Sequence, residues 1–538
     1  MMAFSAFISI FFGKCVSLKA NAVLIFALVS AFACIVPAQA ASKTPGGAVE
    51  ARSVIKAAMK LNRAGKFTEA ETQLRGLVAV QPDNADAKVE LGFTLTKQKR
   101  LSEAYDLVVP VIEANPQNAR ALSVVGIILL SAGRFDDAKA AFFRAVELDR
   151  SQDLAYAGNG LLLYYENRIQ QGLSDMRKAV SLRPNEPDYY YSLGQIATRA
   201  ENYKEASTAY GKFLQVSNIT DRDRRERIKG LINFLTFLGE RSELYERSGE
   251  QSSVIHFDLV GDRPIIEVNI NGRSRPLRFV LDTGSGMSVL SKKTADEFGI
   301  REVARGGFGR GIGGDGRFEI IYGFLRSLDI GDVRIKSIPV YIREFQDSSS
   351  QVDGYIGLSL ISKFLTTIDY GSKTFSLIRQ PDEKGKDAAT AADEDISDDS
   401  LPLRLTSSGF LSGEVALDGS DRRLNFIVDT GASVSVISDL VAANDDIKTT
   451  LANDGRKITV VGSAGITDNV PSYILQKVTF GQYSRDKVLA IAISLDVINE
   501  SAGFDQLGIL GGNFLKNYKL TFDFRKSRVT FSPVSKEN

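Results

Sequence analysis

The chain divides into two halves according to how apolar and polar positions recur along it. From about residue 51 to residue 220, small and apolar residues return at a long, fixed interval. After Gly249, apolar and polar residues alternate instead, as in Ile265–Ile270. Alternation with a period of two is typical of half-buried β-strands. We therefore expect a helical repeat region followed by a β-rich region.

The interval in the first half is 34 residues, as Gly92 and Gly126 show (126 − 92 = 34). The positions that follow it are Gly92, Gly126, Gly160 and Gly194, then Ala70, Ala104, Ala138, Gly172 and Ala206, and finally Pro82, Pro116 and Pro184. Small residues allow two antiparallel helices to approach closely, and a proline ends the second helix before the next repeat begins.

This pattern resembles the tetratricopeptide repeat. The expected copies are residues 51–84, 85–118, 119–152, 153–186 and 187–220. The usual Trp position of the repeat is a departure, because it holds Lys88, Leu122, Tyr156 and Tyr190. A further helical stretch would cap the array, so the helical region is expected to span residues 51–248. The resemblance implies a concave surface that binds a protein partner or a peptide; a rigid spacer or a dimerisation surface is the alternative.

The β-rich half contains two similar regions, which we expect to form all-β lobes at residues 251–380 and 401–535. The Asn271-Gly272 pair, which follows an alternating segment, is a strong hairpin signal. An acidic, Ala-rich segment separates the two regions, and its composition predicts a solvated linker over residues 381–400.

Composition excludes several kinds of chemistry. Lys plus Arg (66) and Asp plus Glu (65) nearly cancel, so no whole-chain charge favours nucleic acid or an acidic membrane. His256 is the single histidine, and the two cysteines, Cys15 and Cys34, lie close to the N-terminus. Sites built on several histidines, Ser-His catalysis and Cys-His catalysis are therefore disfavoured, and no cofactor or metal is expected.

The N-terminus has the layout of a secretory signal peptide over residues 1–40. Lys14 and Lys19 precede an apolar run from Ala22 to Val36, and Ala38-Gln39-Ala40 forms a small-x-small cleavage site. A secreted or periplasmic protein is therefore expected. The alternative is a membrane anchor, which requires this segment to remain uncleaved.

The triplet Asp-Thr-Gly occurs twice, each time between apolar segments. The first copy is Asp282-Thr283-Gly284 and the second is Asp429-Thr430-Gly431. One such triplet is only a turn signal. However, the two halves also share later landmarks, namely Ile356-Gly357 with Leu510-Gly511, and 367–370 with 521–524. The sequence therefore indicates a duplicated unit.

Each half resembles a retropepsin, the single-lobe aspartic protease of the retroviral type. The resemblance implies that Asp282 and Asp429 are the catalytic aspartates. It further implies that Thr283 and Thr430 interlock beneath them, and that Gly284 and Gly431 permit the tight turns. Residues 306–316 would be the flap that closes over substrate. The second Gly-rich segment, 461–465, is thinner and departs from the family pattern.

Two carboxylates in close contact cannot both ionise cheaply, so they share one proton. The ionised member accepts a proton from water as the water attacks the peptide carbonyl, and the protonated member donates to the carbonyl oxygen. Ser285 follows the first triplet, whereas Ala432 follows the second. Since a hydroxyl that hydrogen-bonds a carboxylate favours its charged form, we expect Asp282 to be the ionised member and Asp429 the proton carrier.

The sequence favours an aspartic endopeptidase that cleaves protein or peptide substrates, with the helical repeats recruiting the substrate or a regulator. The two aspartates lie 429 − 282 = 147 residues apart in one chain. An intramolecular pseudo-dimer is therefore favoured over pairing between chains. A different class remains open: a non-catalytic interaction scaffold with silent protease-like lobes.

Overall fold

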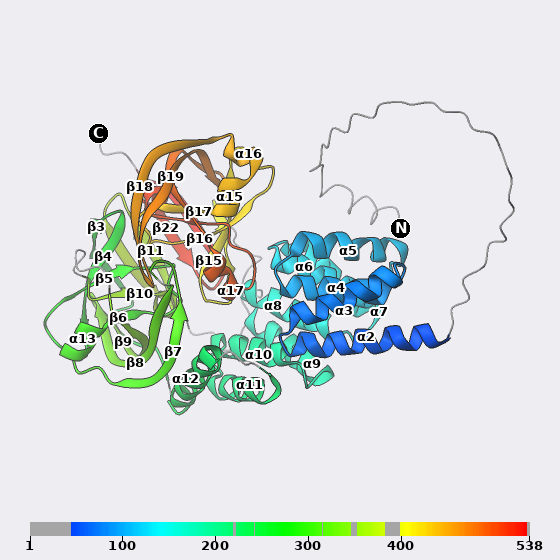
Figure 1. Ribbon diagram of the computed structural model, residues 1–538. Helices are drawn as coiled ribbons and strands as arrows, with labels where there is room; N and C mark the ends of the chain where they lie inside the picture. The colour runs from blue at the N-terminus through cyan, green and yellow to red at the C-terminus, as the bar shows by residue number, and fades with distance from the viewer. Residues whose placement is uncertain are drawn as a thin grey trace. The chain divides into compact units, whose positions relative to one another are not determined.

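The computed structural model describes residues 45–218, 222–241, 243–314, 316–345, 352–381 and 399–534 (Figure 1). The expected signal peptide and nearly all of the expected linker lie outside the described residues. The chain forms two compact units: the first runs up to Ala121 without Arg63–Gly65, and the second contains Arg63–Gly65 and the chain from Leu122 onward.

The first unit consists of helices that pair in antiparallel fashion. They are α2 (Pro45–Arg63), α3 (Phe67–Val80), α4 (Ala85–Lys97) and α5 (Leu101–Ala114). A Cβ atom at Gly92 of α4 would lie 2.2 Å from Cγ2 of Val108 on α5, so this contact needs a residue without a side chain. The side chain of Asn84 caps α4 by accepting a hydrogen bond from the Ala87 N–H.

The second unit begins within α6 and continues the same helix-turn-helix pattern. Its helices are α6 (Ala119–Ser131), α7 (Phe135–Leu148), α8 (Asp153–Tyr165), α9 (Ile169–Leu182), α10 (Pro187–Arg199), α11 (Tyr203–Val216) and α12 (Arg222–Gly239). Gly160 on α8 and Gly172 on α9 face each other, and a Cβ on either would come within 3.1 Å of the other's carbonyl oxygen. The pairs α4–α5, α6–α7, α8–α9 and α10–α11 each begin at the first residue of an expected repeat, whereas α2 begins before residue 51. Helix α12 ends at Gly239, and β1 already begins at Glu246, within the expected helical region.

The first lobe contains a nine-stranded sheet with the order β1-β9-β6-β10-β5-β4-β8-β7, with β3 paired to β4. Its elements are β1 (Glu246–Gly249), β2 (Ser252–His256), β3 (Asp258–Val260), β4 (Arg263–Ile270), β5 (Leu277–Leu281), β6 (Val289–Ser291), α13 (Lys292–Glu297), β7 (Glu302–Arg310), β8 (Arg317–Ile330), β9 (Val333–Arg343), β10 (Gly354–Ile356), α14 (Leu358–Ile361), β11 (Phe364–Asp369) and β12 (Thr374–Arg379).

The second lobe repeats this topology in an eight-stranded sheet with the order β14-β15-β16-β21-β17-β20-β19-β18. Its elements are β13 (Ser400–Pro402), β14 (Arg404–Leu405), β15 (Leu411–Leu417), β16 (Leu424–Val428), β17 (Ser435–Ser438), α15 (Asp439–Ala443), α16 (Asp445–Lys448), β18 (Leu451–Gly462), β19 (Gly465–Phe480), β20 (Tyr483–Ile493), α17 (Asp496–Ala502), β21 (Gly508–Leu510), α18 (Gly512–Leu515), β22 (Tyr518–Asp523) and β23 (Arg528–Pro533).

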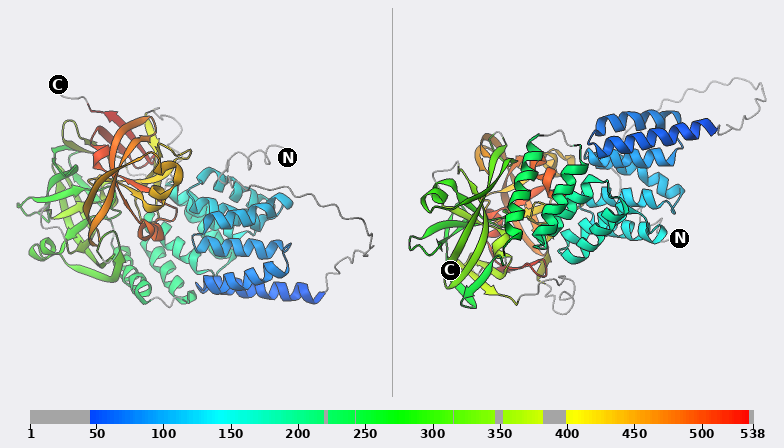
Figure 2. Two further views of the ribbon diagram at one scale, coloured as in Figure 1. Left: turned by 45° about the horizontal axis from the view of Figure 1, so that its top comes forward. Right: turned by 90° about the horizontal axis from the view of Figure 1, so that it is seen from below.

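A third, six-stranded sheet joins the two lobes, which lie next to each other in the left view of Figure 2. Its order is β13-β23-β22-β11-β12-β2, so each lobe supplies half of the strands. The central pair, β11 and β22, is antiparallel and brings Ile368 opposite Leu520. Both side chains are fully buried. The two lobes of one chain therefore share a hydrophobic core.

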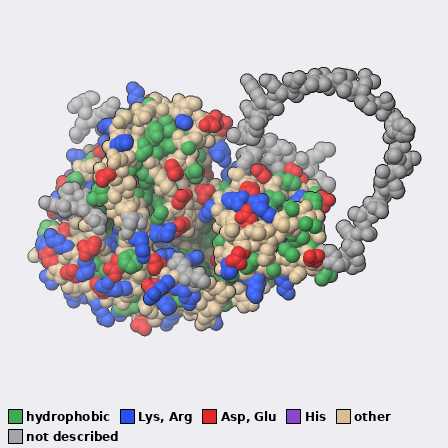
Figure 3. Space-filling model, viewed as in Figure 1, with side chains coloured by type: hydrophobic (Ala, Val, Ile, Leu, Met, Phe, Trp, Pro, Cys, Tyr) green, Lys and Arg blue, Asp and Glu red, His purple; other side chains and the backbone are tan. Residues whose placement is uncertain are grey.

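Helices of the second unit also pack on the lobes. The ring of Phe135 in α7 lies 4.9 Å from that of Phe504, which follows α17. On the other lobe, the ring of Phe234 in α12 stacks on Tyr322 of β8 at 4.3 Å. Among the residues that the structure describes, no helix is both long and apolar enough to cross a membrane. The visible surface carries charged side chains of both signs (Figure 3).

Candidate active site

The two Asp-Thr-Gly triplets occupy equivalent turns in the two lobes. Each follows a buried strand, β5 in the first lobe and β16 in the second, and each strand has a parallel neighbour, β10 or β21. The N–H of Asp282 donates to the carbonyl of Ile356, and the N–H of Asp429 donates to that of Leu510, both at 3.0 Å. The apolar-Gly landmarks of the sequence thus lie directly beside the active-site loops.

Thr283 and Thr430 lock the two turns together. The N–H of Thr283 donates to Oγ1 of Thr430 at 3.1 Å, and the reverse hydrogen bond has the same length. Each hydroxyl in turn donates at 2.7 Å to a carbonyl of the opposite strand, Val428 or Leu281. Both threonines are fully buried. Because these hydrogen bonds cross between the lobes, they fix the relative position of the two aspartates.

The glycine of each triplet leaves room for the aspartate of the other. A Cβ at Gly284 would lie 2.3 Å from Cγ of Asp429, and a Cβ at Gly431 would lie 2.6 Å from Oδ1 of Asp282. The two carboxyl groups come close enough to share a hydrogen bond. The structure therefore brings all six predicted site residues together.

Each carboxyl group is also held by its own loop. Oδ1 of Asp282 accepts from the Gly284 N–H at 2.9 Å, and Oδ2 accepts from the Ser285 hydroxyl at 2.6 Å. On the other side, Oδ1 of Asp429 accepts from the N–H groups of Gly431 at 2.8 Å and Ala432 at 3.2 Å. Ala432, which stands at the position of Ser285 in the second lobe, has no hydroxyl to donate to Asp429.

This difference appears in the protonation of the pair. Burial raises the pKa of both carboxyl groups. For Asp429 the negative charge of Asp282 adds to burial and raises the pKa well above its usual range. For Asp282, burial is opposed by hydrogen bonds from Ser285, Asp429 and the Gly284 N–H, and by the charge of Arg263. The larger rise in the pKa of Asp429 favours a proton on Asp429 and a negative charge on Asp282. The sequence predicts the same assignment from Ser285.

Two β-hairpins, one from each lobe, meet at their tips. The hairpin of β7 and β8 closes at Gly311, whose N–H donates to the Gly316 carbonyl at 3.0 Å. The hairpin of β18 and β19 reaches it, since the Ala464 N–H donates to the Ile312 carbonyl at 2.8 Å. The second hairpin is full-length despite its thinner glycine content, because the turn between its strands needs only the short segment that ends at Gly465.

Two arginines near Asp282 were not singled out from the sequence. Arg263 begins β4 and Arg343 ends β9, and the charge of Asp282 interacts with both. Neither arginine lies within a motif, so only a comparison of equivalent strand positions in the two lobes could have found them.

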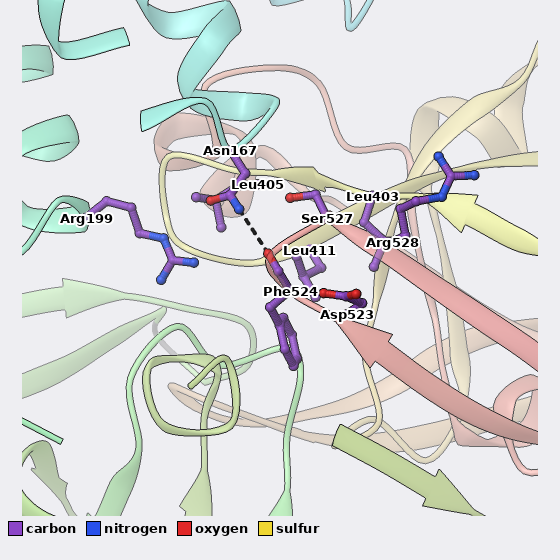
Figure 4. Close-up of a pocket in the computed structure, with 9 residues that line it drawn as sticks. All are labelled: Asn167, Arg199, Leu403, Leu405, Leu411, Asp523, Phe524, Ser527 and Arg528. Carbon is purple, nitrogen blue, oxygen red and sulfur yellow. Dashed lines mark hydrogen bonds between the residues drawn. The ribbon is translucent and has the colours of Figure 1, made fainter. Parts of the chain in front are cut away.

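The described residues contain no group of three or more His, Cys, Asp or Glu side chains that could hold a metal ion. A pocket away from the dyad lies between the turn after α8 and the second lobe (Figure 4). Asn167 spans one side of it by donating a hydrogen bond from Nδ2 to the Phe524 carbonyl at 2.9 Å. None of the predicted site residues lines this pocket.

Comparisons with solved structures found similarity to helical repeat proteins. TTC0263, a thermophilic tetratricopeptide repeat protein of Thermus thermophilus, is 16% identical with a TM-score of 0.30, and the match covers 34% of this chain and 98% of that chain. MamA from Desulfovibrio magneticus RS-1 is 22% identical with a TM-score of 0.23, covering 32% and 97%. YrrB, described as having an unusual peptide-binding site, is 21% identical with a TM-score of 0.21, covering 32% and 91%.

Comparison with curated proteins found no match. Family comparisons cover both parts of the chain. Tetratricopeptide repeat families match residues 61–128, and 109–153 with 158–213. An aspartyl protease family matches residues 266–360, and the gag-polyprotein putative aspartyl protease family matches residues 414–517. The chain therefore carries tetratricopeptide repeats followed by two retropepsin-like aspartyl protease domains.

Proposed function

We propose that the protein is an aspartic endopeptidase whose site is formed by Asp282 and Asp429 of one chain. The observation that carries the proposal is the close approach of the two buried carboxyl groups. Such a pair favours one shared proton. Structural scaffolding does not require two buried acids in contact, since like charges in a site of low polarity repel each other. The aspartic mechanism of peptide hydrolysis does require such a pair.

The chemistry follows from the protonation states. A water molecule between the carboxyl groups loses a proton to Asp282 as its oxygen attacks the peptide carbonyl carbon. Asp429 donates its proton to the carbonyl oxygen, which gives a neutral tetrahedral diol. The proton taken up by Asp282 then passes to the leaving nitrogen, the C–N bond breaks, and a hydroxyl proton returns to Asp429. The cycle restores the single shared proton.

Asn substitution tests this function, because an amide keeps the shape of the carboxyl group. We expect Asp282→Asn and Asp429→Asn each to reduce peptide cleavage by at least about a thousandfold. Asp296→Asn is the control, since Asp296 is an exposed partner of Lys292 on α13. New N-termini generated in a proteome by wild type, and missing with either dyad variant, would identify substrates. Equal cleavage by wild type and dyad variants would leave only the scaffold function.

We further propose that the tetratricopeptide repeats recruit the protein substrate or a regulator. Repeats of this class generally bind proteins or peptides. Crosslinking of the full-length Asp282→Asn variant to bound proteins tests this proposal. Recovery of the same proteins that wild type cleaves supports substrate recruitment. Recovery only of proteins that wild type leaves intact supports a regulator.

We also propose that the chain is exported, as its N-terminal segment suggests. The expected mature N-terminus is Ala41, and the protein should appear in the secreted or periplasmic fraction. Sequencing of the N-terminus of the protein purified from each cell fraction tests both points. A chain that retains residues 1–40 and sediments with membranes would instead support the anchor.

A further inference from the structure

Arg343 and Ile493 occupy the same position in the two lobes. Arg343 ends β9 and pairs with Ser291, the last residue of β6. Ile493 ends β20 and pairs with Ser438, the last residue of β17. Both serines also cap the short helix that follows, Ser291 by accepting from the Thr294 N–H and Ser438 from the Val441 N–H. The duplicated fold thus places a cation in one lobe where the other has an aliphatic side chain.

A second pair shows the same replacement. Ile265 pairs with Val280, which lies two residues before Asp282, and Ser412 pairs with Ile427, two residues before Asp429. Two residues before Ile265 and Ser412 lie Arg263 and Phe410, respectively. The first lobe therefore has arginines at both positions, whereas the second lobe has Ile493 and Phe410.

In the second lobe these positions belong to an apolar cluster. Ile493 and Phe410 pack against a cluster of buried residues: Ile427, Val436, Val470, Ile491, Leu495 and Ile509. Ile312, from the tip of the first lobe's flap, packs against the same cluster. Because Ala432 of the second Asp-Thr-Gly loop also packs against this cluster, the cluster lies next to the dyad. It suits an apolar side chain.

At the equivalent place the first lobe presents an arginine that forms no ion pair with a described carboxylate, although it lies within the field of Asp282. The guanidinium of Arg343 lies 4.0 Å from the ring centroid of Phe318 on the flap strand β8. Its Nε is buried and has no hydrogen-bond partner, and no described carboxylate forms an ion pair with it. The Nε of Arg263 is likewise buried without a partner. Burial lowers the pKa of Arg343, and the nearby charge of Asp282 opposes that effect.

A guanidinium with a buried Nε–H that lacks an acceptor is costly. A carboxylate is the group that satisfies a guanidinium best, through paired hydrogen bonds. We propose that Arg343, assisted by Arg263, binds an acidic side chain of the substrate. In the same substrate, the apolar cluster of the second lobe binds an apolar side chain on the other side of the scissile bond. This inference rests on the proposed peptidase function and names its substrate class.

A peptide library tests the inference directly. Wild-type enzyme should select Asp or Glu at one position on one side of the cleaved bond and an apolar residue on the other side. In the best peptide, replacing Glu with the isosteric Gln should lower kcat/KM at least about tenfold, because the charge is lost while the shape is kept.

Variants of Arg343 assign the preference to this residue. Arg343→Ile, which installs the second lobe's residue, should lower kcat/KM for the Glu peptide at least about tenfold more than for the Gln peptide. Arg343→Lys should retain part of the Glu preference, and Arg343→Glu should favour a Lys peptide. Arg334→Ile is the control, since Arg334 is exposed on the same strand and already paired with Asp329.

The outcomes separate this inference from the proposed function. If wild type cleaves no library peptide, the peptidase function fails and the inference fails with it. Cleavage without acidic preference, or equal loss on the Glu and Gln peptides in Arg343→Ile, overturns the inference alone. Equal loss would mean that Arg343 acts on Asp282 or on the fold. Thermal melting checks that each variant is folded. If Arg343→Ile does not fold, the inference is still tested by Arg343→Lys and by comparing Glu and Gln peptides with wild type.

Discussion

Thr367 and Thr521 lie directly opposite each other on β11 and β22, and their hydroxyl oxygens are 3.1 Å apart. The two residues occupy the same position in the two duplicated regions. Their pairing therefore places the centre of the six-stranded sheet at a point of approximate two-fold symmetry between the lobes. Thr283 and Thr430 repeat this relationship at the candidate site.

This symmetry predicts that one chain is sufficient for activity. We expect the activity per molecule to stay constant across a dilution series. A mixture of the Asp282→Asn and Asp429→Asn variants should remain inactive, because each chain supplies both lobes of its own site. If sites formed between chains, the mixture would assemble some pairs with both aspartates intact. Recovery of activity in the mixture, against wild type at equal concentration, would show pairing between chains.

Ser285 offers a test of the unequal protonation of the pair. Its hydroxyl donates to Asp282 and favours the ionised form, which lowers the pKa of that carboxyl group. Ser285→Ala should therefore raise the pKa of Asp282, so that activity at the acidic end of the pH–rate profile falls. Ala432→Ser is the matched control, because a new hydroxyl beside Asp429 should move the alkaline limb to lower pH. An acid limb that does not move in Ser285→Ala contradicts the assignment of Asp282 as the base.

The local parts of the fold could be predicted from the sequence. The repeat period, the two triplets and the apolar-Gly landmarks are short patterns, and the structure puts Ile356 and Leu510 beside the triplets as those patterns indicate. The length of the second flap was harder to judge from composition. Its strands β18 and β19 form a regular antiparallel pair, and such a pair does not need many glycines.

The arginines near Asp282 could not be predicted in the same way. Arg343 reaches the site because β9 pairs in parallel with β6, and Ser291 and Arg343 are far apart in the sequence. No local pattern encodes that register. The contact between α12 and the flap strand β7 has the same origin, since the helical and β-rich halves carry separate sequence signals. Both features therefore depend on long-range packing, which no local sequence pattern predicts.

The acidic pair should cost the fold stability at neutral pH. Both carboxyl groups have a raised pKa in the folded state, so the folded protein binds protons more tightly than the unfolded chain. Their contribution to stability is complete below the unfolded pKa and is lost as pH rises through the folded values. Asp429→Asn removes the group with the larger rise, so it should stabilise the protein at pH 7 and flatten the dependence of Tm on pH.

Calorimetry across pH measures this effect. A rise in Tm of about 2 °C or more at pH 7 corresponds to about 1 kcal/mol in a domain of roughly 150–250 residues. Asp296→Asn, at an exposed position, should leave both Tm and its pH dependence nearly unchanged. A lower Tm for Asp429→Asn at neutral pH would mean that the ionised pair does not destabilise the native fold.

Gly230 in α12 connects the helical repeats to the flap of the first lobe. A Cβ at this position would lie 2.1 Å from the carbonyl oxygen of Arg305 in β7, so any side chain must push the helix away from the flap strand. Arg227, one turn earlier, donates to the Phe308 carbonyl of the same strand at 2.9 Å. We expect Gly230→Ala to destabilise the second unit by about 1–3 kcal/mol, as overpacking does.

The matched control for this change is Gly211→Ala, because Gly211 lies in α11 with no atom within 4 Å of a new Cβ. Alanine there should be neutral or stabilise the helix by up to about 1 kcal/mol. Since Gly230→Ala shifts the base of a flap and not the dyad, KM should rise more than kcat falls. Hydrogen exchange should be faster in β7 and β8 of this variant only. Unchanged exchange in both strands would mean that α12 does not hold the flap, and the repeats would then act on substrate solely by binding it.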